Sequence, residues 1–448
     1  MKPSWWQALR VYGQPRMISM LLLGFSAGLP FYLIYQTLSA WLRTVGIQRS
    51  TIGMLAWVGL AYSLKFLWAP VVDRLPIPIL TRLVGRRRSW MLLAQFGLVA
   101  GLAYMSSNDP ARAVLPMALC ALFIAFCAAT QDIAIDAWRI ESAPVDDQGA
   151  MAAAYQLGYR AALIVGGAGA LALADDYGWR FSYLTMAALV GVGVLTTIMS
   201  AEPSVSRQSL SFDHEQRVVD WLQRRPHWPE WLRTAGSWFV GAVICPFTEF
   251  FARYGLPLAL LILFFMSGYR LTDFAMGSMT NSFYIDKGFS LKEIAAVVKF
   301  YGLLASLVGV VIAGVVIAKI GLLRSLVVGS LMVMVSNCLF SVLAGIDQPS
   351  LLQLGMVNGF DNLALAMHGT ALIAFLSSLT SARYTATQYA LFSSFYALFG
   401  KILEGFSGFV VDGIGYQLFF VYTASLSIPA LIMLLFLVRR GVVPAPRN

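Results

Sequence analysis

The sequence predicts an all-α membrane protein with twelve transmembrane helices arranged in two six-helix bundles. Of its 448 residues, 58% are hydrophobic and only 12% are charged, whereas ordinary soluble domains carry about 25% charged residues. Apolar stretches of about 20 residues, the length that crosses a hydrocarbon core, recur twelve times. The first and second halves of the chain also carry similar segments at similar intervals.

The twelve apolar stretches define the expected spans. They cover 17–42, 51–70, 89–106, 113–138, 149–174 and 180–200, then 257–284, 291–318, 322–344, 350–378, 384–411 and 416–438. No small-residue cleavage site follows a short apolar core near the N-terminus, so we expect the first span to be retained. With the N-terminus inside, the inner segments collect 21 Lys and Arg and the outer loops six. The positive-inside rule therefore places both termini in the cytoplasm.

A polar and aromatic segment, 201–256, separates the two bundles, which we expect to span 1–200 and 257–448. Indole and guanidinium groups together are typical of membrane interfaces, so we expect amphipathic helices on the cytoplasmic leaflet. The stretch 236–255 is nearly long enough to cross, but Pro246, Glu249 and Arg253 interrupt it, and we place it at the surface. The aromatic and basic residues are Trp221, Trp228, Trp231, Arg217, Arg224, Arg225 and Arg233.

The halves of the chain resemble each other. A shift of 237 residues brings GGAGALALADDYGW, which ends at Trp179, onto EGFSGFVVDGIGY, which ends at Tyr416. The turn AKIGLLR at 318–324 likewise corresponds to the turn that contains Asp73 and the GRRR run at 85–88. Two six-span repeats related by an axis along the membrane normal describe the major facilitator architecture, in which substrate binds between the halves.

Ten ionisable residues fall inside the expected spans. A charge at that depth costs about 2.5 to 3.5 kcal/mol on insertion scales, so each needs a partner or a water-filled cavity. Five cations facing a cavity would suit a ligand with several carboxylates, to which Gln36, Gln131, Tyr155 and Asn362 add weaker hydrogen-bonding candidates. The ten residues are Lys65, Arg160, Arg270, Lys299, Lys401, Asp132, Asp136, Asp273, Asp361 and Glu404.

Two of the cations have an acidic residue three positions further along the same helix. Arg270 with Asp273, and Lys401 with Glu404, are three residues apart, so each pair either forms a salt bridge along its own helix or contacts ligand. Both acidic partners are candidates for proton coupling.

Other acidic residues are candidates for a gate or for carrying a proton. Asp136 lies near the cytoplasmic end with Arg139 three residues on, and with Asp73 and Arg86 we interpret it as part of a gate rather than a ligand site. Asp132 and Asp361 have no basic residue within one turn of their own helices, so we expect them to carry protons.

Three basic residues are expected at the cavity or near it. Lys65 and Arg160 are too deep to reach the interface, which favours a cavity role, while Lys299 could reach the outer interface instead. For His368, a structural role is favoured over a proton relay.

Several stretches together resemble the AmpG permease family of the major facilitator superfamily. The stretches that weigh most are KFLWAPVVDR at 65–74 and ATQDIAIDAWR at 129–139, because charged motifs inside spans rarely arise by chance. The others are LGFSAGLP at 23–30, TIG at 51–53, GRRRSW at 85–90, GYR at 158–160, AEP at 201–203 and TATQYAL at 385–391.

The resemblance implies a proton-driven importer in the inner membrane of Gram-negative bacteria. Its cargo would be N-acetylglucosaminyl-1,6-anhydro-N-acetylmuramyl peptides recovered for cell-wall recycling. The residues carried over by position are Lys65, Asp132, Asp136, Arg160, Asp273, Lys299, Asp361 and Asn362.

The chain departs from the family at Asp361, where Glu is common, and at Lys401, where Arg is common, and His368 is also unusual. We expect a monomer among membrane lipids, without cofactor, metal or nucleic acid.

Two alternatives to muropeptide import stay open. The first is transport of another organic anion such as acyl-coenzyme A. The second is a membrane enzyme or receptor, which is disfavoured because the sequence has no His and Glu metal cluster, no GxSxG nucleophile elbow and no soluble signalling domain. Four cysteines stand singly in apolar surroundings and are expected to be free thiols.

Overall fold

The computed structural model describes residues 13–47, 58, 60–110, 114–144, 147–203, 216–290, 293–381, 384–404 and 406–439. Every element in these residues is a helix. Ten of the helices in the described residues are long and apolar enough to cross a membrane, so the chain is a multi-pass membrane protein. The number twelve and the cytoplasmic termini stay predictions. Arg10, Arg440 and the expected TIG stretch at 51–53 lie outside the described residues.

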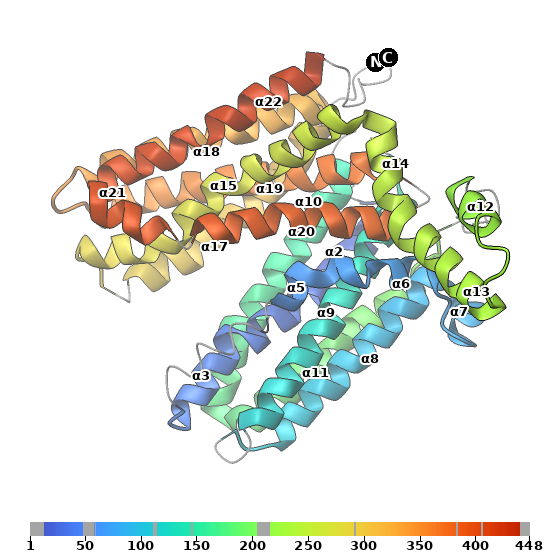
Figure 1. The fold of residues 1–448 in the computed structure, drawn as a ribbon. Helices are drawn as coiled ribbons and strands as arrows, with labels where there is room; N and C mark the ends of the chain where they lie inside the picture. The colour runs from blue at the N-terminus through green and yellow to red at the C-terminus, as the bar shows by residue number, and fades with distance from the viewer. Residues whose placement is uncertain are drawn as a thin grey trace.

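The N-terminal helices form the lower group in Figure 1. Helix α2 packs closely on α10, where a Cβ at Gly158 would fall on the carbonyl oxygen of Leu21. The bounds are α2 (Pro15–Ile34), α3 (Gln36–Thr44), α5 (Leu60–Leu64), η3 (Lys65–Leu67), α6 (Ala69–Arg74), α7 (Leu80–Val84), α8 (Arg86–Ser107), α9 (Val114–Ser142), α10 (Gln148–Ile164), η5 (Val165–Gly169) and α11 (Ala170–Met199).

The C-terminal helices form the upper group, and the linker helices lie beside both groups. Helix α19 begins with a capping box in which Ser350 and Gln353 exchange hydrogen bonds. The linker helices are α12 (Gln216–Gln223), α13 (Glu230–Phe239), η7 (Val240–Ile244) and α14 (Cys245–Tyr254). They precede α15 (Leu256–Asp286), η8 (Ile294–Tyr301), α17 (Gly302–Ile320), α18 (Leu322–Ala344), α19 (Leu351–Leu379), α20 (Thr385–Glu404), α21 (Ser407–Ser425) and α22 (Ser427–Arg439).

The chain reverses within α11. Gly178 has φ 83° and ψ 161°, which a glycine adopts without steric cost. The Ser182 hydroxyl donates to the Ala170 carbonyl at 2.6 Å, whereas residues twelve apart in a continuous helix are separated by about 18 Å. Gly415 in α21 has nearly the same conformation, φ 74° and ψ 165°. These two glycines are 237 residues apart, which is the shift that aligns the two halves of the sequence.

The segment from Glu230 to Tyr254, which the sequence places at the surface, forms a helix of 25 residues. By length and composition it is one of the ten candidate spans. Its π-helical middle, η7, contacts α6, and α14 contacts α15 and α20. The segment therefore contacts both groups of helices, and its depth in a membrane stays a prediction.

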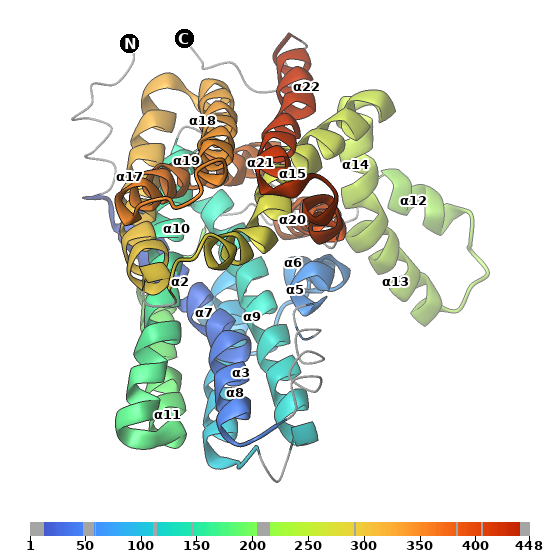
Figure 2. The same cartoon turned by 90° about the vertical axis from the view of Figure 1, so that its left-hand side faces the viewer.

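The two groups of helices meet at one end and separate toward the other. They converge where α6, α14 and the start of α20 lie, here called the closed end, and diverge toward α3 and α21, here called the wide end (Figure 1). Figure 2 views the molecule from the wide end. At the closed end Ala386 and Ala390 of α20 pack with Ala69 and Val72 of α6. Ala153 of α10 packs against the C-terminal helices α17 and α19.

Candidate functional site

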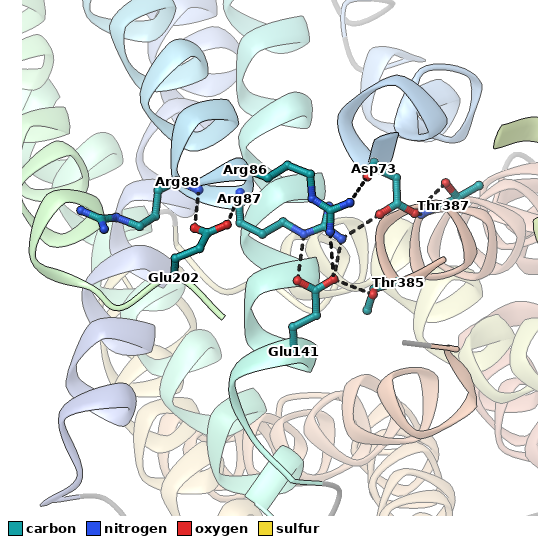
Figure 3. A network of polar contacts seen from close by, with 8 residues as sticks. All are labelled: Asp73, Arg86, Arg87, Arg88, Glu141, Glu202, Thr385 and Thr387. Carbon is teal, nitrogen blue, oxygen red and sulfur yellow. Dashed lines mark hydrogen bonds and ion pairs between the residues drawn. The ribbon is translucent and has the colours of Figure 1, made fainter. Parts of the chain in front are cut away.

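A network of charged side chains occupies the closed end (Figure 3). Asp73 lies in the last turn of α6, Arg87 in the first turn of α8, and Glu141 in the last turn of α9. One nitrogen of Arg87, Nη2, lies 2.7 Å from Asp73 Oδ1 and 2.5 Å from Glu141 Oε1. The guanidinium is 1% exposed. A buried cation shared by two carboxylates holds the ends of three N-terminal helices together.

The same two carboxylates bind the first turn of α20, on the other half of the molecule. Thr387 donates to Asp73 Oδ2 through its backbone N–H at 3.2 Å and its hydroxyl at 3.0 Å. The Thr385 hydroxyl donates to Glu141 Oε1 at 2.7 Å. The first N–H groups of a helix lack partners within that helix and carry a partial positive charge. Asp73 therefore caps a helix of the opposite half, and these contacts join the two halves at the closed end.

The Asp73 carboxyl stays ionised at neutral pH. Burial alone would raise its pKa, but the charges of Arg87 and Arg86 and the hydrogen bond from Arg87 outweigh burial and hold the pKa below its usual value of 3.8. We call Asp73, Arg87, Glu141, Thr385 and Thr387 the polar gate.

Arg86 and Glu202 brace the polar gate from within the N-terminal half. Arg86 Nη1 donates to the Asp73 carbonyl at 2.5 Å. Glu202, which follows α11, accepts from the backbone N–H groups of Arg87 at 2.8 Å and Arg88 at 3.2 Å. A carboxylate at this position satisfies free N–H groups of α8 and interacts favourably with its dipole. Glu202 thereby fixes where α8 presents Arg87.

A second contact between the halves lies at Arg139, near the polar gate along α9. Arg139 Nη2 lies 3.2 Å from Asp136 Oδ1, as its spacing on α9 predicts. The other terminal nitrogen, Nη1, donates to the Ser377 hydroxyl at 2.6 Å, and the guanidinium lies 5.0 Å from the ring centroid of Tyr389. Ser377 belongs to α19 and Tyr389 to α20. Asp136 therefore contacts a residue that joins the two halves, and its role in a gate stays a prediction.

Lys65, for which a cavity role is predicted, lies beside this contact. Its Nζ is 3.7 Å from Asp136 Oδ2, and the side chain is 10% exposed. The same ammonium lies within electrostatic reach of Asp132, whose Oδ1 is buried without a hydrogen-bond partner in the described residues. Tyr155 of α10 lies within reach of both carboxylates. Lys65 is therefore the cation shared by the two aspartates of the QDIAID stretch.

Arg160 and Arg270 bring like charges together between the halves. Arg160 is on α10 and Arg270 on α15, and each lies within electrostatic reach of the other. Within the described residues no salt bridge joins Arg160 to a carboxylate, and its Nε is buried without a partner. Arg270 Nε lies 2.8 Å from Asp273 Oδ2, which is the pairing that the i, i+3 spacing predicts. Among the described residues, Asp273 alone forms an ion pair with either arginine, so two positive charges face one negative charge at this place.

His368 also binds Asp273. Its Nδ1 lies 3.1 Å from Asp273 Oδ2, and the fully buried ring stacks on Tyr269 with centroids 3.8 Å apart. Asp361, two turns before His368 on α19, instead accepts from the Ser336 hydroxyl at 2.7 Å. The histidine therefore orients Asp273 rather than Asp361.

The structure describes the side chains of some of the remaining candidates and not of others. Gln131 is fully buried, and its carbonyl oxygen accepts from Ser26 at 3.0 Å. Asn362 donates to the Asn358 carbonyl at 2.9 Å, one turn back on α19. Glu404 ends α20 and is partly buried. The side chains of Gln36, Lys299 and Lys401 lie outside the described residues.

Sequence reasoning missed the partners that the gate uses. Arg87, Glu141, Thr385 and Thr387 form it, whereas the sequence singled out Arg86 with Asp73 and Asp136. A signal existed, because GRRRSW, AEP and TATQYAL are stretches of the family resemblance, and they contain Arg87, Glu202 and both threonines.

Comparisons with known proteins identify the family of the chain. The family model of the Major Facilitator Superfamily matches residues 20–403. The chain is 35% identical over 432 residues to the anhydromuropeptide permease of Escherichia coli K12, covering 96% of this chain and 81% of that protein. It is 31% identical to the putative transporter AmpG 4 of Rickettsia felis, with coverages of 96% and 98%.

Among solved structures, the chain is similar in fold to the proton:xylose symporter XylE bound to 6-bromo-6-deoxy-D-glucose. The TM-score is 0.65 at 13% sequence identity, covering 96% of this chain and 95% of that one. This likeness concerns the fold alone, whereas the two sequence relatives match nearly the whole chain. The chain therefore belongs to the AmpG permease family of the major facilitator superfamily.

Proposed function

We propose that this protein imports anhydromuropeptides from the periplasm across the bacterial inner membrane, driven by protons. The family membership supports the cargo, since an Escherichia coli relative is an anhydromuropeptide permease. Such cargo carries peptide carboxylates and sugar rings, which require cations and hydrogen-bonding groups in the binding site.

One observation carries the proposal for the site. Arg160 and Arg270 come from opposite halves and lie within electrostatic reach of each other, and among the described residues Asp273 is the one carboxylate that forms an ion pair with either of them. Two guanidinium groups at close range repel each other unless an anion lies between them, and each can bind a carboxylate through two parallel hydrogen bonds. A carboxylate of the cargo would supply the missing negative charge and draw the halves together around it.

Alternating access would follow from the arrangement of the two ends. We assign the closed end to the cytoplasm and the wide end to the periplasm, so that the structure corresponds to the state that receives cargo. Opening the polar gate would break the hydrogen bonds from Thr385 and Thr387 while leaving Arg87 with Asp73 and Glu141, because those three residues belong to one half. The halves can then rock about the α10, α17 and α19 contact.

Asp132 is the residue best suited to bind and release the transported proton. It lies in the span beside Lys65, one of its carboxylate oxygens has no partner in the described residues, and its neighbour Asp136 is already paired. Protonating Asp132 would release Lys65 toward Asp136 and so change the charge next to the Arg139 contact. Asp361, held by Ser336, is the corresponding candidate in the second half.

Uptake into proteoliposomes tests the function. With an imposed inward proton gradient, we expect wild type to concentrate labelled anhydromuropeptide, Asp132→Asn to lose gradient-driven accumulation, and Lys65→Ala to weaken uptake. Acyl-coenzyme A supplied in parallel serves as the competing anion. Accumulation of acyl-coenzyme A but not of anhydromuropeptide would overturn the assignment, and unchanged accumulation by Asp132→Asn would overturn the proton route.

A further inference from the structure

The hairpin of α12 and α13 carries arginines and tryptophans that the transport site does not use. Residues 216–239 contain four arginines against two carboxylates, Asp220 and Glu230. Trp228 is 45% and Trp231 70% exposed. The arginines are Arg217, Arg224, Arg225 and Arg233.

The hairpin displays these groups together. The guanidinium of Arg225 lies 4.7 Å from the ring centroid of Trp221 and 5.3 Å from that of Trp228, and the two indoles meet edge to face. A cation over aromatic rings is held in position without being neutralised. Exposed indoles beside arginines suit the headgroup region of a bilayer, where the indole is partly buried and the arginine meets phosphate.

The apolar side of the hairpin packs against Tyr384, the residue next to the polar gate. Val218 of α12 packs in a buried cluster with Val240, Cys245 and Tyr384. Tyr384 immediately precedes the gate residue Thr385. On the N-terminal half, the Arg74 guanidinium lies 4.8 Å from the centroid of the Tyr384 ring. Tyr384 therefore contacts both the linker and the half that its own helix must leave when the gate opens.

A second tie joins the linker to the start of α20. The Gln388 side-chain amide donates to the Pro246 carbonyl at 3.0 Å and to Glu249 Oε2 at 2.6 Å. Arg253 lies 2.7 Å from Glu249 and donates to the Leu379 carbonyl at 3.1 Å. These bonds connect α14 to the end of α19 and to the first turn of α20, which bears the gate threonines.

We propose that the α12–α13 hairpin binds anionic phospholipid headgroups and that this binding stabilises the closed polar gate. With the hairpin docked, Val218 is buried, whereas Arg224, Trp228 and Trp231 are exposed and Arg225 lies over the rings of Trp221 and Trp228. Undocking on gate opening would release the hairpin from the buried contact of Val218 with Tyr384 and leave it without a fixed position, so the lipid would bind the ordered, docked form better. A ligand shifts a conformational equilibrium only through such a difference in affinity.

The test measures the conformation in vesicles and needs no cargo, so its outcome is independent of the proposed function. Spin labels at Thr44→Cys and Ile414→Cys report the separation of the halves at the wide end. Cys338→Ser removes the exposed native thiol, and the three buried cysteines are kept. Vesicles of phosphatidylcholine alone are compared with vesicles that also contain phosphatidylglycerol.

We expect phosphatidylglycerol to raise the long-distance, gate-closed population several-fold, and about 1 M salt to reduce that shift, because the Debye length falls to about 3 Å. The shift should be lost in R224Q/R225Q and reduced in Val218→Ala, which keeps every arginine. It should persist in Arg180→Gln, an exposed arginine outside the hairpin. Equal populations in the two vesicles, or a full shift in R224Q/R225Q, would overturn the proposal.

Discussion

The Thr385 hydroxyl offers the most specific way to weaken the polar gate. The substitution Thr385→Val keeps the shape of the side chain and removes the 2.7 Å bond to Glu141. Glu141 keeps its ion pair with Arg87, so the N-terminal half is left intact. A hydrogen bond to a charged group contributes about 1.5–3 kcal/mol. The ratio of closed to open gate should therefore fall by a factor of about 10 to 150.

Hydrogen–deuterium exchange measures this ratio at the gate itself. The Thr387 N–H is bound to Asp73 while the gate is closed, so it exchanges only after the gate opens. Exchange of the peptide that covers this residue should speed up in Thr385→Val by the factor given above. Ser393→Ala is the matched control on the same helix, because its hydroxyl donates to the Ala390 carbonyl within α20. Equal exchange rates in Thr385→Val and wild type would refute the latch.

Three further predictions concern charge, burial and packing. Since the pKa of Asp73 is lowered, its contribution to the closed gate persists above its usual pKa of 3.8 and is lost only as pH falls through the lower native value. Hydrogen exchange at the gate, corrected for intrinsic rates, should therefore be unchanged from neutral pH to about pH 5. Faster corrected exchange in that range would contradict the assignment. Arg87→Gln removes the buried cation that pairs with Asp73 and Glu141, a loss of about 3–5 kcal/mol, so its melting temperature in detergent should fall well below that of the exposed control Arg82→Gln; similar values would refute the buried ion pairs. Gly158→Ala should destabilise the contact of α2 with α10, whereas Gly191→Ala, where nothing lies within 4 Å of an added Cβ, should not; equal melting temperatures for the two variants would refute the close packing.

The repeat between the halves could be predicted from the sequence because it rests on backbone requirements. Gly178 and Gly415, paired by the 237-residue shift, both adopt positive φ at the reversals between helices. The short-range pairs could be predicted as well, since Arg270 with Asp273 and Asp136 with Arg139 depend only on helical spacing.

Contacts between distant segments could not be derived in this way. His368 binds Asp273, although 95 residues separate them, because α15 and α19 present their side chains at one place. The gate threonines are unremarkable in sequence and gain their role only when the first turn of α20 meets Asp73. Glu202 acts through the backbone of α8, and a backbone donor has no signature in the sequence.

The charge between the halves is the feature on which the transport proposal depends most. Binding of labelled anhydromuropeptide to purified protein should be compared with binding of the same compound with its peptide carboxylates amidated, in wild type and in Arg160→Gln. We expect wild type to prefer the free carboxylate strongly and Arg160→Gln to lose that preference while binding the amidated form about as well as wild type. If Arg160→Gln keeps the full preference, the carboxylate does not bind between the two arginines.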